Sequence, residues 1–169
     1  EPLLFTSSLL IGKELFTQTI SKTTTSIYSN VNEVLADEDF EFKKILEKMD
    51  IKIKLDIIHK FIEQLECEHK LILKNNNTIH TSLNYVVDII KDIETEIKHI
   101  NDEIKIHKLK WFHKFRVANY KTMINNLIIH LKLLDERFEL FIKLLKIYIT
   151  LYFIIYNLFF KINTTTIIV

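Results

Sequence analysis

Apolar residues recur at alternating steps of four and three along the second half of the chain. In the segment that starts at Thr78 they are Ile79, Leu83, Val86, Ile90, Ile93, Ile97, Ile100 and Ile104. This spacing places the apolar side chains on one stripe of an α-helix, and a sustained stripe is typical of a helix bundle or coiled coil. The pattern therefore predicts a helix over 78–113, with Thr78 as its N-cap after the turn at 75–77.

The last helix is the longest that the pattern predicts. Its apolar positions again alternate steps of four and three, and they are Tyr120, Ile124, Leu127, Leu131, Leu134, Phe138, Phe141, Leu145, Tyr148, Tyr152, Ile155 and Phe159. This stripe predicts a helix over 118–161.

The pattern over 39–73 is less regular. One apolar stripe consists of Phe42, Leu46, Met49 and Ile53, and a second stripe, rotated from the first, consists of Ile51, Leu55, Ile58, Ile62 and Leu65. Two interpretations stay open: one helix turns its apolar face between Asp50 and Leu55, or two helices meet there. In either case we expect the helical segment to end near Lys74.

A further helix is predicted over 7–36, with Ser7 or Ser8 as its N-cap. Its apolar positions are Leu9, Phe16, Ile20, Ile27, Val31 and Val34. The intervening Thr and Ser residues are mediocre helix formers. The alternative is therefore a flexible N-terminal segment followed by a shorter helix.

The chain has one Gly and one Pro among 169 residues. Tight turns depend on these residue types, so a chain that almost lacks them consists of a few long elements, whereas a sheet would need many hairpin turns. We therefore expect an all-α fold, an antiparallel up-down-up-down four-helix bundle whose last helix is the longest. It forms a single domain over 1–169, with flexible tails at 1–6 and 163–169.

Charge and cysteine content exclude several classes of protein. The 23 basic and 22 acidic residues lack the basic excess of a nucleic-acid-binding domain. The single cysteine, Cys67, excludes an internal disulfide framework and favours a reducing, intracellular location. The frequent Ile, Lys and Asn residues are typical of an AT-rich genome.

No arrangement of residues indicates catalysis. Glu66/His69 and Glu96/His99 match the Glu-x-x-His spacing of di-iron bundle proteins. However, His69 lies close to the chain reversal at 75–77 and His99 lies far from it, so the two pairs cannot meet in an antiparallel hairpin. A Gly-rich phosphate loop and a Ser/His/Asp set are both missing from the sequence. We therefore expect a protein that is not an enzyme and has no cofactor or metal ligands.

Bases and aromatic residues gather in the segment HKLKWFHKFR. A contact with an anion or a lipid headgroup is one interpretation, and its residues would be Lys108, Lys110, Trp111, Lys114 and Arg116. The other interpretation, which we prefer, is that the cations stabilise a helix C-terminus while Trp111 covers the end of the core.

The end of the last helix is the most apolar part of the chain. Ile147–Phe160 carries no charge, and the other helix ends expected at the same pole are also mostly apolar. Because the last helix is predicted to be longer than the helix before it, its turns near Phe153–Lys161 extend beyond the bundle. The stretch is shorter than the roughly 20 apolar residues of a membrane span.

Three ways of covering this end stay open: burial in the bundle or under the N-terminal EPLLF segment, contact with a second copy or a protein partner, and contact with a membrane. The expected partner or membrane contacts are Tyr152, Phe153, Tyr156, Phe159 and Phe160. The sequence favours an interaction or structural module that self-associates or binds a protein through its apolar pole and C-terminal helix. The alternative is a membrane-associated or membrane-perturbing bundle that inserts this end.

Overall fold

The computed structural model describes residues 15–36, 40–109 and 121–166 of the chain. Within these ranges the helices are α2 (Leu15–Leu35), α3 (Phe40–Lys48), α4 (Ile51–Glu68), α5 (Lys70–Asn75), α6 (Asn77–Leu109) and α7 (Lys121–Thr166). The predicted all-α fold class is confirmed: four long helices pack against one another, and α7 is the longest of the described helices. The helix start predicted near Ser7 and the end predicted near 113 lie outside the described residues.

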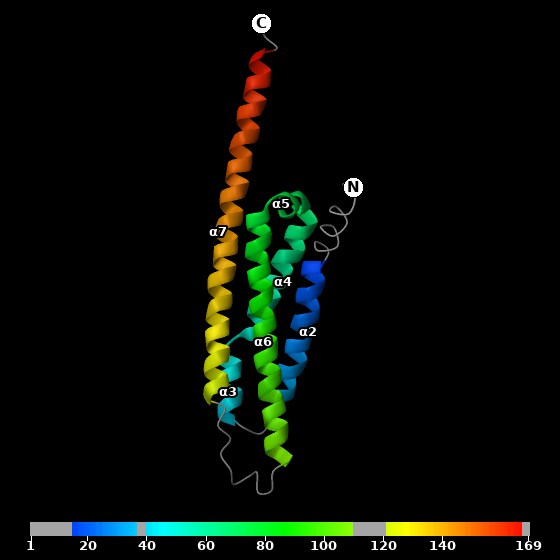
Figure 1. Ribbon diagram of the computed structural model, residues 1–169, viewed down its shortest axis with the longest axis vertical. Helices are drawn as coiled ribbons and strands as arrows, with labels where there is room; N and C mark the ends of the chain where they lie inside the picture. Colours follow the sequence, from blue (N-terminus) through cyan, green and yellow to red (C-terminus); the bar gives the residue numbers. More distant parts are fainter. Residues whose placement is uncertain (1–14, 37–39, 110–120, 167–169) are drawn as a thin grey trace, which may run out of the picture.

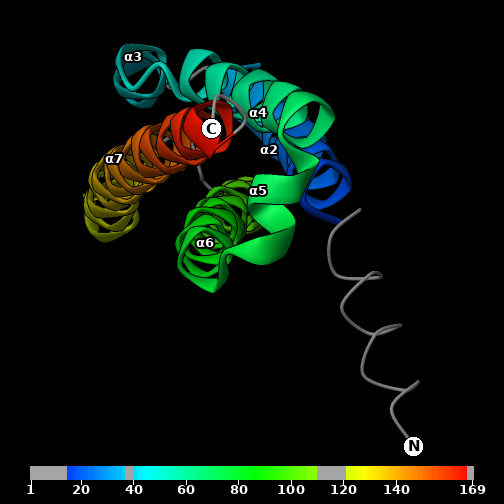
Figure 2. The ribbon, with the colours of Figure 1, turned by 90° about the horizontal axis from the view of Figure 1, so that it is seen from above.

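The long helices alternate in direction along the chain, but their spatial order differs from their sequence order. In Figure 1, α2 and α6 run downwards while α4 and α7 run upwards. Helix α6 packs closely against both α7 and α2, and α2 also packs against α4. Seen from above in Figure 2, α5 carries the chain from the end of α4 across to the start of α6. The parallel helices α2 and α6 are therefore direct neighbours.

The open question over 39–73 is resolved in favour of separate helices. Helix α3 ends at Lys48, and Asp50 takes a left-handed backbone conformation with φ 49° before α4 begins at Ile51. Asp is among the few residues besides Gly that adopt this conformation readily. A second break at His69 separates α4 from α5. The break at Asp50 explains why the apolar stripe through Leu46 is rotated from the stripe through Leu55.

The predicted N-cap of α6 is wrong by two positions. The side-chain oxygen of Asn76 accepts hydrogen bonds from the backbone N–H groups of Thr78 at 3.0 Å and Ile79 at 3.1 Å. Asn76 is therefore the N-cap, and Thr78 already lies in the first turn of the helix. The physical reason is that Asn is at least as good an N-cap as Thr, and its side chain reaches the free amides of the first turn.

Most of the core consists of the apolar stripes that the sequence pattern predicted. Ile53 was placed on a stripe and is 59% exposed, whereas Val87 and Ile89 are buried outside the predicted stripe of α6. Fully buried side chains come from all four long helices and include Ile20, Ile27, Leu55, Ile62, Leu83, Ile93, Ile97 and Phe141. Between α4 and α7 the contact is aromatic. The ring of Phe61 lies edge-on to Phe138 at 5.7 Å and to Phe141 at 6.4 Å between ring centroids. These large side chains join α4 to α7.

A polar cluster joins the parallel helices α2 and α6. Asn101 on α6 is 2% exposed, and its side-chain amide donates to the side-chain oxygen of Asn30 at 3.1 Å and to the Glu33 carboxylate at 2.5 Å, both on α2. Lys105 forms an ion pair with Glu33 at 2.9 Å. The hydrogen bond from Lys105, followed by that from Asn101, lowers the pKa of Glu33. The cluster satisfies the buried amide and fixes how far α2 can slide along α6.

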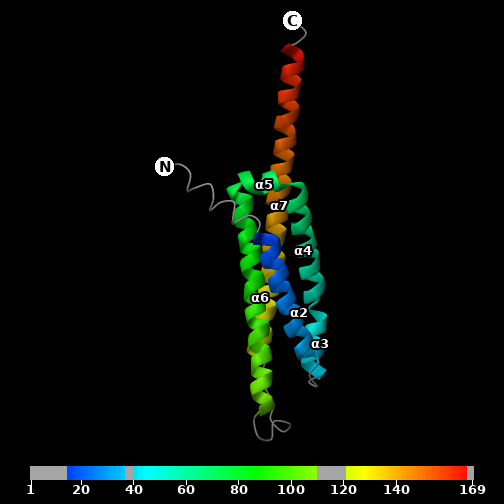
Figure 3. The same ribbon diagram turned by 90° about the vertical axis from the view of Figure 1, so that its right-hand side faces the viewer.

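The last part of α7 extends beyond the rest of the bundle. Figures 1 and 3 show α7 continuing past α5, which crosses the end of the other helices. Leu145 is the last buried side chain described in α7, Tyr148 is partly buried, and the side chains from Ile149 to Asn157 are exposed. The extension therefore begins about one turn before the predicted position near Phe153. Burial of these side chains by the described helices is excluded.

Candidate interaction surface

The α7 overhang, Ile149–Thr166, has an unusual surface. Every residue from Leu151 to Tyr156 is a large apolar or aromatic residue, and their exposed fractions lie between 49% and 66%. Successive residues are about 100° apart around a helix, so this run covers all sides of the overhang. A helix that is apolar on all sides is normally buried. A contiguous exposed apolar patch of this kind is therefore a candidate interaction surface.

One stripe of the overhang continues the face of α7 that packs on the core. Phe141 and Leu145 are buried against the other helices, and Tyr148 is packed at the edge of the core. Steps of four and three residues lead from Tyr148 to Tyr152 and Ile155, which are both exposed. The face that α7 uses for its own bundle thus runs on beyond the point where its partner helices end.

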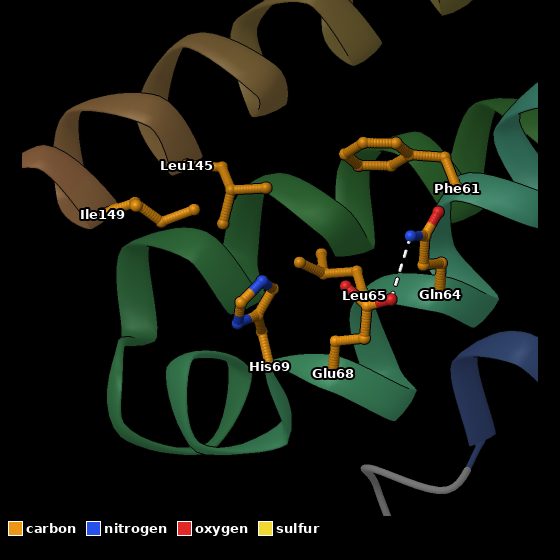
Figure 4. A pocket seen from close by; sticks show the side chains of 7 residues that line it. All are labelled: Phe61, Gln64, Leu65, Glu68, His69, Leu145 and Ile149. Atoms are coloured by element: carbon orange, nitrogen blue, oxygen red, sulfur yellow. Dashed lines mark hydrogen bonds between the residues drawn. The ribbon is translucent and has the colours of Figure 1, made fainter.

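A half-open pocket lies where the overhang leaves the bundle (Figure 4). It has a volume of about 200 Å³ and is lined by Phe61, Gln64, Leu65, Glu68, His69, Leu145 and Ile149. The α7 side of the pocket is apolar, whereas on the α4 side Gln64 donates a hydrogen bond of 3.0 Å to Glu68. Small-molecule sites usually measure about 300–1,000 Å³. The pocket is therefore smaller than a typical small-molecule site.

The structure brings together some of the residues that the sequence predicted as partner contacts. Tyr152, Phe153 and Tyr156 lie exposed on the overhang. Phe159 and Phe160 lie in α7, but their side chains are outside the described residues.

The contribution of α4 to this surface was not predicted from the sequence. Phe61 and Leu65 line the pocket beside Leu145, far along the chain. The predicted stripe included Leu65 and did not include Phe61, and nothing in the pattern showed that the two residues lie beside the start of the overhang.

The predicted basic cluster is only partly visible. Lys108 and His107 both lie in the last turn of α6, where Lys108 is exposed and His107 is partly buried. The charge of Lys108 contributes to the lowered pKa of Glu33, after the larger effects of Lys105 and Asn101. Lys110, Trp111, Lys114 and Arg116 lie outside the described residues. The contact with an anion or a headgroup and the stabilisation of a helix C-terminus by these cations therefore both stay predictions.

The Glu-x-x-His pairs lie in different surroundings. The hydroxyl of Thr17 donates to Glu66, whereas Glu96 accepts a hydrogen bond of 3.3 Å from Asn126. Among residues 15–36, 40–109 and 121–166, no three His, Cys, Asp or Glu side chains are grouped so that they could hold a metal ion. The same part of the chain contains no helix with both the length and the apolar character needed to cross a membrane.

Comparison with known proteins gives one informative similarity. No protein family matches the chain, and no solved structure matches it. The chain is similar to the "Uncharacterized protein L717" of Acanthamoeba polyphaga mimivirus, with 26% identity over 148 residues that cover 74% of this chain and 72% of that protein. That relative is viral, and its name states no activity, ligand or partner.

Proposed function

We propose that this protein is a non-enzymatic structural or interaction module that binds a protein partner or another copy of itself through the α7 overhang. The observation that carries the proposal is the exposure of every side chain from Leu151 to Tyr156. A helical extension without tertiary contacts is only marginally stable in water. Covering this segment would stabilise the helix and remove apolar surface from water at about 25 cal/mol for each Å².

The size of the apolar surface supports this proposal. A large side chain that is half exposed contributes roughly 80–100 Å². The residues from Leu151 to Tyr156 together therefore expose about 500 Å², near the upper end of the roughly 300–600 Å² that the largest patch on a typical monomer reaches. On this chain the patch is concentrated in a short stretch of a single helix.

The end of the bundle beside the overhang adds a second point of contact. This end consists of α5 and the adjoining ends of α4 and α6; the sequence predicted an apolar pole here, but several of its described side chains are polar and exposed, among them Glu68, His69 and Thr78. The pocket between Leu65, Leu145 and Ile149 offers a partner a recess next to the exposed Tyr152. Interfaces are held chiefly by a few large, well-buried side chains that fit such recesses, and aromatic residues are frequent among them.

Insertion of the overhang into a membrane surface is a second candidate function. The same observation favours it, because lipid also covers a helix on all sides and aromatic side chains are frequent in interfacial helices. The two candidates differ in what the overhang contacts, which is a protein in the first case and lipid acyl chains in the second.

The test combines light scattering of the full chain over a range of concentrations, hydrogen–deuterium exchange and liposome flotation. The interaction function predicts either self-association or a monomer whose overhang amides exchange freely. A strict monomer with protected amides over Ile149–Thr166 would show that the chain covers its own overhang, and the proposed function would fail. Flotation that Ile155→Glu abolishes and Ile57→Glu leaves intact would favour the membrane function instead.

A further inference from the structure

We infer that the α7 overhang pairs with the overhang of a second copy of this chain, in antiparallel orientation about a two-fold axis, so that the two bundles lie at opposite ends of the paired overhangs. This inference rests on the proposed function and names its partner. It is carried by the direction of the exposed stripe, the shape of the bundle and the absence of charge from Ile147 to Asn157.

The stripe formed by Tyr152 and Ile155 faces the space above the bundle. It continues the face on which Phe141 and Leu145 contact the core, and helical spacing keeps it pointing to the same side. Figures 1 and 3 show that α5 ends the bundle below this space. A partner that covers the stripe therefore lies directly above α5, in line with the bundle.

This position excludes a parallel pair of overhangs. In a parallel pair the bundle of the second copy would lie below its own overhang, in the volume that α4, α5 and α6 of the first copy occupy. In an antiparallel pair the second bundle lies at the far end of the overhang, where it meets none of the described helices. The two stripes can then face each other along their whole length.

The dimensions suit such a pair. Residues Ile149–Thr166 form a helix about 27 Å long at about 1.5 Å per residue. Two antiparallel overhangs of this length bring the end of each α7 to the other copy's pocket beside Leu65 and Leu145. A stable interface buries about 800 Å² on each partner. Contact through the stripe of Tyr152 and Ile155 buries only part of the roughly 500 Å² exposed by Leu151–Tyr156, so the remaining area comes from the pocket and from the end of the partner's α7.

The absence of charge also favours a second copy. Along the solvent face of α7 within the bundle, ion pairs join Lys132 to Glu136 and Lys143 to Glu139. From Ile147 to Asn157 the chain carries no charged residue. Over this stretch two identical surfaces do not repel each other and bury no charge on contact, and Lys161 is the one charged residue of the overhang beyond it. A two-fold axis lets this one apolar surface serve as both halves of a closed interface.

The first test measures the oligomeric state of the full chain by sedimentation velocity over a range of concentrations. We expect a dimer, and we expect Ile155→Glu to weaken dimerisation at least 100-fold. Ile57→Glu is the matched control, since Ile57 on α4 is 59% exposed and Ile155 is 61% exposed. It should leave the dimer intact. Circular dichroism checks that both variants remain helical. A dimer that Ile155→Glu does not weaken would overturn the inference.

The second test measures orientation with single cysteines in a Cys67→Ser background and a short bis-maleimide crosslinker. In the antiparallel pair the two copies of Tyr156 lie about 5 Å apart along the axis, whereas the two copies of Tyr148 lie about 28 Å apart. Tyr156→Cys should therefore crosslink to itself and Tyr148→Cys should not. Crosslinking of both variants would show a parallel pair and overturn the inference.

Other outcomes separate this inference from the proposed function. A trimer or larger assembly that Ile155→Glu dissolves overturns the antiparallel pair and retains self-association. A monomer with freely exchanging overhang amides would show that a second copy does not bind the overhang. The expected partner would then be a different protein. A monomer that binds phosphatidylcholine vesicles through Ile155 overturns the pair in favour of lipid. A monomer with protected overhang amides removes both the inference and the proposed function.

Discussion

The side-chain amide of Asn101 on α6 donates a hydrogen bond of 2.5 Å to the Glu33 carboxylate on α2. It connects two parallel helices that are neighbours in space and distant in the chain. If α2 slid by one turn along α6, the buried amide of Asn101 would lose its partners, which costs about 1–3 kcal/mol. Apolar stripes alone tolerate such shifts better, so this polar contact helps to define the register of the two helices.

Replacing Asn101 with Ala should lower the free energy of unfolding by about 1–3 kcal/mol, because a buried hydrogen-bond donor to Asn30 and Glu33 is lost. Urea denaturation followed by circular dichroism measures this change. Asn125→Ala is the control, because Asn125 is exposed on α7. Equal effects of the two substitutions would contradict a role for Asn101 in holding α2 to α6.

Glu33 should make the protein sensitive to acid. Hydrogen bonds from Lys105 and Asn101 favour its charged form and lower its pKa in the folded state. A lowered folded-state pKa means that its contribution to stability is complete above the unfolded-state pKa of about 4.3 and is lost as pH falls through the folded-state value. The stability difference between the wild type and Glu33→Gln should therefore be largest above about pH 5 and shrink in acid.

Denaturation of both proteins at a series of pH values measures this difference, and NMR titration of the Glu33 carboxyl measures its pKa directly. A stability difference that stays constant from neutral pH into acid would show that the charge of Glu33 does not control the pH dependence of stability.

Phe141 should be among the most costly core residues to truncate. It is fully buried, and its ring contacts Phe61 and Phe138 between α4 and α7. Phe141→Ala should lower the free energy of unfolding by about 3–5 kcal/mol, because it removes apolar contacts and leaves a cavity. The adjacent Leu140 is half exposed, so Leu140→Ala serves as the control and should cost much less. Chemical denaturation of the two variants compares them, and equal losses would contradict this packing.

Hydrogen exchange should vary along α7. Amides up to Leu145 belong to the packed part of the helix and should be strongly protected. In the Ile155→Glu variant, the amides of Ile149–Thr166 should exchange much faster, because a helical end without partners frays. In the wild type their protection should rise with protein concentration. Uniform protection along α7 in a monomeric Ile155→Glu variant would contradict this expectation.

The burial pattern within each helix could be predicted from the sequence. The stripe from Ile79 to Ile104 is buried along α6 because helical periodicity determines which side chains share a face. The arrangement of neighbours could not be predicted in the same way. A stripe shows which face is buried and does not show which helix covers it, so the contact of α2 with α6 became visible only in three dimensions.

Helix boundaries and the candidate surface show the same limit. The break at Asp50 depends on a left-handed backbone that the sequence indicated only as a rotated stripe. Exposure of Phe153 followed from comparing predicted helix lengths, whereas Tyr152 lies before the predicted start of the extension. The pocket that Leu65 shares with Leu145 depends on the packing of distant segments, and local spacing carries no information about it.

The central position of α6 has a consequence for how the chain is made. Phe16 on α2 packs edge-on against His80 on α6, at 5.0 Å between ring centroids. During synthesis α2 leaves the ribosome well before α6 is complete. At about 5–20 residues per second, the interval between Leu35 and Leu109 is roughly 4–15 s. Until α6 emerges, the side of the nascent α2 that will face α6 stays in water. Exposed apolar surface of this kind is what chaperones bind.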